Sequence, residues 1–153
     1  MDFPLTRVRR AAAADAPSMQ HVAAAAYTPY LTRMAGVRPK PMDTDYLAAV
    51  GESEAWVAEA AGEVVGLLLL IAEGDAMLLE NVAVLPSHHG RGIGRQLLRL
   101  AEERAADLAL GRVRLYTHVT MVENQALYER IGYVETGRET VGDRSRIFYE
   151  KRV

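Results

Sequence analysis

The chain has 153 residues, half of them hydrophobic and a quarter charged, which is enough for one globular domain with a substantial core. Its net charge of −2 argues against a general attraction to nucleic acid, and its lack of cysteine excludes disulfides, thiolate metal sites and a cysteine nucleophile. The first ten residues lack the apolar core of a signal peptide, and the longest apolar run, residues 64–72, is too short to span a bilayer. We therefore expect one cytoplasmic domain, residues 1–153, with no metal site and no nucleic-acid or membrane partner.

The first third of the chain predicts one strand followed by short helices and loops. In order, these are a strand at 6–10 anchored by Leu5 and Val8, a helix that begins at Asp15, a further helical turn at 31–34, a proline-containing loop at 37–42 and a short helix at 43–50. Asp15 suits a helix cap because Pro17 follows it in the first turn. Asp43 or Thr44 is the expected cap of the short helix.

From residue 54 the hydrophobic period changes to that of strands. Three strands of a meander are expected, around residues 56–58, over 63–72 and over 76–85, with Ala61-Gly62 and Glu73-Gly74-Asp75 as the turns. The predicted elements after the meander are a helix from about Gly94 to Leu110 stopped by Gly111, a strand over 113–119, a helix over 123–131, and strands over 133–136 and 144–151. The helical crossover predicts that the 76–85 and 113–119 strands are parallel in a mostly antiparallel sheet.

A glycine loop, residues 86–94, connects the third meander strand to the following helix. Gly90, Gly92 and Gly94 stand at alternate positions, and Arg91 and Arg95 add positive charge. Backbone amides that converge at a helix N-terminus can bind a phosphate group, although such a loop is also compatible with a plain strand-to-helix connection. The loop is not a P-loop, because no Lys-Ser/Thr follows the last glycine, and it lacks the βαβ context of a Rossmann fingerprint.

The stretch His89-x-x-Gly92-x-Gly94, which follows Val84-Leu85-Pro86, resembles motif A of the GNAT-type N-acetyltransferases. His89 stands where the family has Gln or Arg. Residues 124–133, NQALYERIGY, are similar to motif B of that family, and the order of strands matches it over essentially the whole chain. The resemblance implies the α+β, three-layer GNAT fold, with a central, mostly antiparallel and partly splayed sheet covered by helices on both faces.

The resemblance also implies that acetyl-CoA is the cofactor. Its pyrophosphate is expected on the backbone amides of residues 89–95, and its pantetheine arm beside the 76–85 strand, like an added strand. The implied cofactor-binding residues are Val82, Ala83, Val84, His89, Gly90, Arg91, Gly92, Ile93, Gly94, Arg95 and Asn124.

Acetyl transfer from a thioester to an amine needs a proton acceptor for the amine, donors for the oxyanion and a proton for the departing thiolate. We predict Glu80 as the base, because a carboxylate in an apolar strand is a better proton acceptor; a strand-end glutamate paired with an arginine is the alternative. His118 is the rival base. The resemblance implies Tyr128 as the acid, although a helical tyrosine is more often a core residue, and it implies that a backbone amide near Val82, at a bulge, meets the oxyanion.

Aromatic and polar residues of the irregular N-terminal region are expected to cover the site and to contact the acceptor. They are Tyr27, Tyr30, Arg33, Met34 and Tyr46, which could equally form a local core. The predicted function is transfer of acetyl from acetyl-CoA to a primary amine of a small molecule, amino acid or peptide, by direct attack in a ternary complex. The alternative is a non-catalytic acetyl-CoA-binding sensor or partner module. A homodimer is plausible.

Overall fold

The computed structural model describes residues 6–153, and Leu5 with the four residues before it lies outside that range. Seven strands form one sheet in the order β1-β2-β3-β4-β5-β7-β6. They are β1 (Thr6–Arg10), β2 (Glu54–Ala60), β3 (Glu63–Glu73), β4 (Ala76–Val84), β5 (Arg112–His118), β6 (Val134–Val141) and β7 (Arg144–Arg152). Neighbouring strands are antiparallel except β4 and β5, which are parallel as the crossover predicted.

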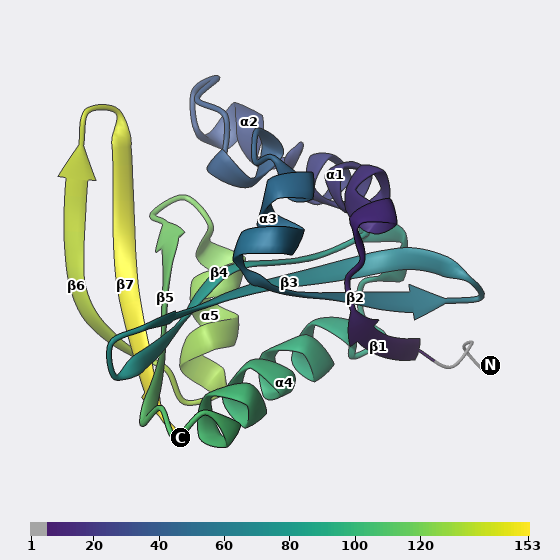
Figure 1. Cartoon of the computed structure of the whole chain (residues 1–153). Coiled ribbons are helices and arrows are strands. Elements are labelled where there is room, and N and C mark those ends of the chain that lie inside the picture. Colours follow the sequence, from purple (N-terminus) through teal and green to yellow (C-terminus); the bar gives the residue numbers. More distant parts are fainter. Residues whose placement is uncertain (1–5) are drawn as a thin grey trace.

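Helices cover both faces of the sheet (Figure 1). On one face lie α1 (Ala16–Tyr27), α2 (Tyr30–Arg33) and α3 (Tyr46–Glu52), and on the other lie α4 (Ile93–Asp107) and α5 (Val122–Arg130). This is the expected three-layer α+β arrangement. None of the helices within residues 6–153 has the length and apolar composition needed to cross a membrane.

The continuous apolar run of β3 is explained by burial on both faces. Leu67 and Leu69 are buried in the core beneath α1, whereas Leu68 and Leu70 are buried in the core beneath α4. A strand covered on both sides has no solvent face, so it loses the alternation of polar and apolar residues. The central strands β3 and β4 are therefore held firmly between two helical layers.

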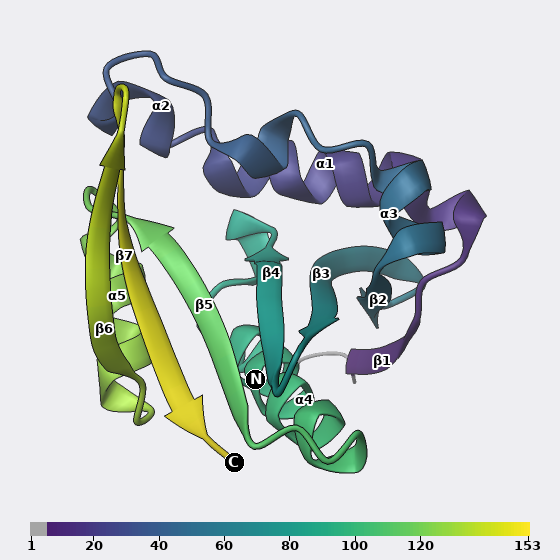
Figure 2. The ribbon, with the colours of Figure 1, turned by 60° about the vertical axis from the view of Figure 1, so that its left-hand side comes forward.

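Two irregularities interrupt the ladders of β4, and Figure 2 shows the first of them, the divergence of β4 from β5. First, β4 and β5 pair only over Ala76–Leu78 and Arg112–Arg114, and then diverge although β4 continues to Val84 and β5 to His118. This confirms the expected splay. Second, Leu69 pairs with Asn81 while Leu70 pairs with Leu79, so that Glu80 is the extra residue of a β-bulge.

The N-cap of α3 and the C-terminal end of α4 differ from the predictions. Asp45, not Asp43 or Thr44, caps α3, and its carboxylate accepts a hydrogen bond from the Ala48 amide at 3.1 Å. The Asp43 carboxylate is bound by Arg38 instead, and the Thr44 hydroxyl donates to the Lys40 carbonyl. Local side-chain partners thus compete with the role of helix cap.

Helix α4 ends at Asp107, three residues before the predicted end at Leu110. Ala109 adopts the left-handed conformation, with φ of 57°, and the Leu110 amide donates to the Ala105 carbonyl at 2.8 Å. This is a Schellman motif with alanine where glycine is usual. Gly111 instead donates to the Asp75 carbonyl, and thus joins the end of the helix to the β3–β4 turn.

The hairpin of β6 and β7 is longer than predicted. The sequence indicates a strand only over 133–136, but β6 pairs with β7 as far as Val141 and Arg144. Most of β6 is exposed, so it lacks the apolar pattern by which a strand is recognised.

Candidate functional site

Two hollows meet where β4 and β5 separate. The first, the groove, has a volume of about 910 Å³ and lies between the end of α1, α2, the second half of β4, the glycine loop and α5. The second, the inner cavity, has a volume of about 100 Å³ and is lined by β4, the end of β5, the start of β7 and the loop before α3. The residues that line both are Val82, Asn124 and Tyr128.

The glycine loop presents an anion-binding helix N-terminus to the groove. Gly90 and Gly92 have φ of 76° and 81°, a left-handed conformation that side chains with a Cβ rarely adopt. Within residues 6–153, the amides of Ile93 and Gly94 have no acceptor, and the α4 dipole adds positive potential there. The groove is lined by all the predicted cofactor-binding residues except Arg91.

His89, the departure from motif A, attaches the glycine loop to β4. Its Nε2 lies 3.0 Å from the carbonyl oxygen of Val84. A carbonyl only accepts, so Nε2 carries the proton and donates. The side chain therefore has a structural contact at the edge of the groove.

Glu80, the predicted base, is half-buried and lines the inner cavity. No ion pair or hydrogen bond connects its carboxylate to another residue in the described range 6–153. The alternative of a strand-end glutamate paired with an arginine is therefore not what the structure contains. The bulge sets this carboxylate apart from the regular ladder, next to Asn81.

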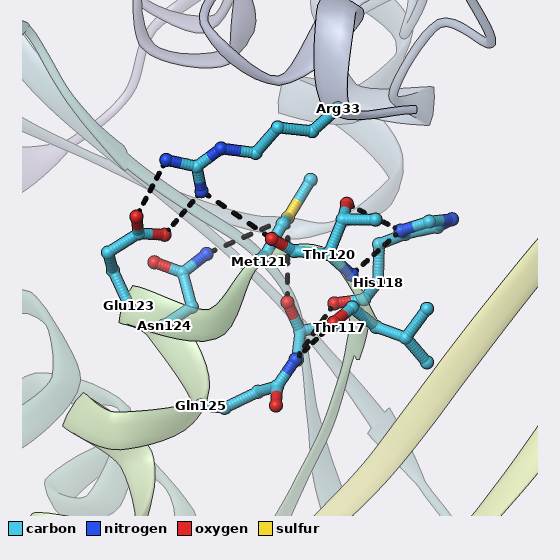
Figure 3. A network of polar contacts seen from close by, with 9 residues as sticks. Arg33, Thr117, His118, Thr120, Met121, Glu123, Asn124 and Gln125 are labelled. Carbon is cyan, nitrogen blue, oxygen red and sulfur yellow. Dashed lines mark hydrogen bonds and ion pairs between the residues drawn. The ribbon is translucent and has the colours of Figure 1, made fainter. Parts of the chain in front are cut away.

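His118, the rival base, lies at the end of β5 and lines the inner cavity (Figure 3). Its Nδ1 accepts the backbone N–H of Thr120 at 3.1 Å and contacts the Thr120 hydroxyl at 2.8 Å. The lone pair on Nδ1 is thus engaged, and the neutral ring carries its proton on Nε2. Burial, and secondarily the positive charge of Arg144, lower the pKa of His118.

Tyr128 is packed in the core and also belongs to the wall that the two hollows share. The ring lies 5.8 Å from that of Tyr133 and 6.1 Å from that of Tyr149, and the residue is only 6% exposed. Its hydroxyl has no hydrogen-bond partner in the part of the chain that the structure describes. Burial raises the pKa of Tyr128, so the hydroxyl remains protonated at neutral pH.

A chain of hydrogen bonds fixes the cavity wall at Asn81. The Tyr27 hydroxyl donates to Asn81 Oδ1 at 2.7 Å, Asn81 Nδ2 donates to the Tyr46 hydroxyl at 3.0 Å, and that hydroxyl donates to the Pro41 carbonyl at 2.6 Å. Asn81 was not predicted as a site residue. A single amide within an apolar strand, beside Glu80, is the signal that could have found it.

The five predicted acceptor residues separate into three locations. Tyr27 and Met34 line the inner cavity, whereas Tyr30 and Arg33 line the groove. Tyr46 is buried behind Asn81 and lines neither. The sequence placed them in one cluster because they are close along the chain, but α1, α2 and α3 present them in different directions.

Arg33 joins α2 to α5 across the groove (Figure 3). Its guanidinium donates to both carboxylate oxygens of Glu123 at 2.6 and 2.7 Å, and it lies 5.2 Å from the Tyr30 ring centroid. Hydrogen bonds from Arg33 lower the pKa of Glu123 to about 2. The pair is exposed, so it acts more as a geometric link than as a source of stability.

Comparison with known proteins agrees with this geometry. A model of the Acetyltransferase (GNAT) family matches residues 18–133, which is more than half of the chain. The chain belongs to the GNAT acetyltransferase family. The computed fold of this GNAT protein resembles that of PaiA N-acetyltransferase from Thermoplasma acidophilum, solved in complex with coenzyme A, with a TM-score of 0.80, 18% identity and coverage of 97% and 99% of the two chains.

Curated relatives of this GNAT protein include the uncharacterized N-acetyltransferase YjgM of Escherichia coli. It is 35% identical over 82 residues, which are 51% of this chain and 49% of YjgM. Human N-acetyltransferase 8 is 27% identical over 128 residues, covering 80% of this chain and 56% of the human protein. The matches thus span about half the length of these relatives.

The hydrogen bonds from Arg33 should keep Glu123 ionised at pH values well below the usual pKa of a glutamate. In an NMR titration of side-chain carboxyl groups, we expect Glu123 to titrate near pH 2 and to return toward 4.5 in Arg33→Gln. A carboxylate with a lowered pKa stabilises the fold above its unfolded pKa, and that contribution is lost as the pH falls through the folded value. Arg38→Gln, which removes a guanidinium bound to Asp43 instead, is the control. A Glu123 pKa that stays near 4.5 in the parent protein would contradict the contact.

Proposed function

We propose that this GNAT protein is an acetyl-CoA-dependent N-acetyltransferase that acetylates a primary amine of a small acceptor by direct attack in a ternary complex. The observation that carries the proposal is the meeting of the groove and the inner cavity at Val82, Asn124 and Tyr128. Two separate hollows allow donor and acceptor to be bound at once, with their reactive atoms at the shared wall. No covalent enzyme intermediate is then needed, which suits a chain without cysteine.

The groove suits acetyl-CoA, which supplies an activated acyl group when bound. The free amides of Ile93 and Gly94 are suited to its pyrophosphate, and the side chain of Arg95 adds a cation at the groove. The edge of β4 beyond Leu78 has no pairing with β5, so its backbone groups can bind an amide-bearing arm. The solved coenzyme A complex of the structurally similar Thermoplasma protein supports this assignment.

Glu80 is better placed than His118 to take the proton from the acceptor amine. The Glu80 carboxylate lines the inner cavity and both of its oxygens are uncommitted within residues 6–153. His118 has its Nδ1 lone pair engaged by the Thr120 amide, which leaves the ring as a donor through Nε2. Only a group with an available lone pair can serve as a base, so we assign that role to Glu80 and the role of acceptor orientation to His118.

Tyr128 is the proposed proton donor to the departing thiolate. Its hydroxyl lies at the shared wall and, unlike those of Tyr27 and Tyr46, donates to no other described residue. The raised pKa of Tyr128 keeps the proton in place until the thiolate needs it. Packing against Tyr133 and Tyr149 holds the ring in position.

Acetyl-CoA binding is the first test. At a hundredfold excess over Kd, we expect the ligand to raise the Tm by about 5 °C or more, because it binds only the native state. Release of free thiol should then depend on an added primary amine. No shift at saturating acetyl-CoA would contradict the proposed cofactor, and binding without turnover of any amine would favour the sensor alternative.

Glu80→Gln should lower kcat/KM at neutral pH about 100-fold or more, because the variant lacks a proton acceptor. The loss should shrink as the pH rises and the free amine deprotonates unaided. His118→Gln keeps a side-chain donor in the cavity and should lower kcat/KM less than tenfold. The measurement is a pH profile of kcat/KM for both variants; the opposite ranking would assign the base to His118.

Tyr128→Phe should lower kcat about tenfold or more while the affinity for acetyl-CoA stays nearly unchanged, because only the hydroxyl is removed. Tyr133→Phe is a matched control: its hydroxyl is also buried and unpartnered, but the residue lines neither hollow. Steady-state kinetics with calorimetric titration of coenzyme A measures both effects. Equal kcat values for the two variants would exclude Tyr128 as the acid.

A further inference from the structure

The inner cavity has more positive than negative charge, although the whole chain has a net charge of −2. Among the described residues that line it, Glu80 is the one carboxylate, whereas Lys40, Arg144 and Arg146 are cations. From this asymmetry we infer that the acceptor is a small primary amine that also carries an anionic group, of the carboxylate or phosphate kind. The inference rests on the proposed function and specifies its acceptor.

Two of the three cations lack a counterion within the described residues 6–153. Arg144 donates to the Arg38 carbonyl at 3.0 Å and has no carboxylate partner, and Lys40 has no side-chain partner. Arg38 itself is neutralised by Asp43, so the neighbourhood does provide a carboxylate, but not to Arg144. A cationic side chain that has no carboxylate partner in the protein is available to an anionic group of a ligand.

Arg146 is held in place at the cavity wall. Its guanidinium lies 4.7 Å from the Tyr116 ring centroid and 3.3 Å from a Glu139 carboxylate oxygen, and Arg146 is opposite His118 in the β5–β7 ladder. A stacked guanidinium has lost part of its conformational freedom before a ligand arrives. The cation and the Nε2–H of His118 can thus act together as donors to an anionic group.

The charges are separated along the cavity. Lys40 and Arg144 are exposed and belong to its rim, where the loop before α3 meets the tip of the β6–β7 hairpin (Figure 2). Glu80 is half-buried and lies deeper, beside the buried Leu79 and Asn81. An acceptor would therefore enter with its amine toward Glu80 and Tyr128 and leave its anionic group at the rim. A cavity of about 100 Å³ limits this to a small molecule.

Matched acceptors test the inference. Each of a set of L-amino acids would be compared with its carboxamide and its decarboxylated amine, and phosphoethanolamine with ethanolamine, by thiol release from acetyl-CoA. We expect kcat/KM at least about tenfold higher for the anionic member of at least one series. The amino-acid and phosphate series distinguish the two kinds of anion. Equal or better turnover of the amines that lack the anionic group overturns the inference but leaves the proposed function intact, whereas no turnover of any amine contradicts the proposed function itself.

Charge variants supply the second arm. Lys40→Gln with Arg144→Gln should raise KM for the anionic acceptor about tenfold or more, with little change in KM for the matched amine that lacks the anionic group or for acetyl-CoA. Arg138→Gln, on the same hairpin but outside both hollows and paired with Glu135, is the control. Circular dichroism verifies folding. A double variant that keeps the full preference for the anionic acceptor overturns the inference.

Discussion

The interruption of pairing between β4 and β5 is the constraint on which the rest of the site depends. Parallel strands normally continue their ladder, and buried backbone groups without partners are costly. Here the ladder stops after Ala76–Leu78, and the two strands lead away from each other to Val84 and His118. The two buried cores on either side of β3 keep β4 rigid despite this lost support. The gap is thereby a stable feature of the fold, ready for a ligand that offers peptide-like groups.

The two hollows use different electrostatics for different tasks. In the groove, positive potential comes from backbone amides, the dipole of α4 and the side chain of Arg95, a combination that suits a phosphate group. In the inner cavity it comes from side chains on a loop and a hairpin, opposed by the carboxylate of Glu80. Tyr128, with a raised pKa and a hydroxyl that has no partner among the described residues, lines both hollows. Tyr128 therefore stays neutral and adds no negative charge to the wall that the two hollows share.

Much of the cofactor side was predictable from the sequence because it is continuous in the chain. Residues 82–95 contain the end of a strand, a glycine loop and a helix start, whose local patterns determine their geometry, and of the predicted cofactor-binding residues only Arg91 does not line the groove. On the acceptor side the sequence singled out Glu80 and His118, but not Lys40, Asn81 and Arg144, since these three belong to separate segments of the chain. The local sequence does not indicate that Asn81 is hydrogen-bonded to two tyrosine hydroxyls, or that the β-bulge lies at Glu80. These depend on strand register and on side chains brought from a distance.

The wall shared by the two hollows is small, and this affects how related proteins can come to differ in their acceptors. Because, within residues 6–153, only Val82, Asn124 and Tyr128 line both hollows, replacements in the loop before α3 or at the hairpin tip would reshape the proposed acceptor cavity and leave the lining of the groove unchanged. Natural variation is tolerated most readily in such peripheral segments. A protein with this arrangement could change the amine that it accepts and keep the same acetyl-transfer chemistry. We therefore expect close relatives to share the acetyl donor and to differ in the acceptor.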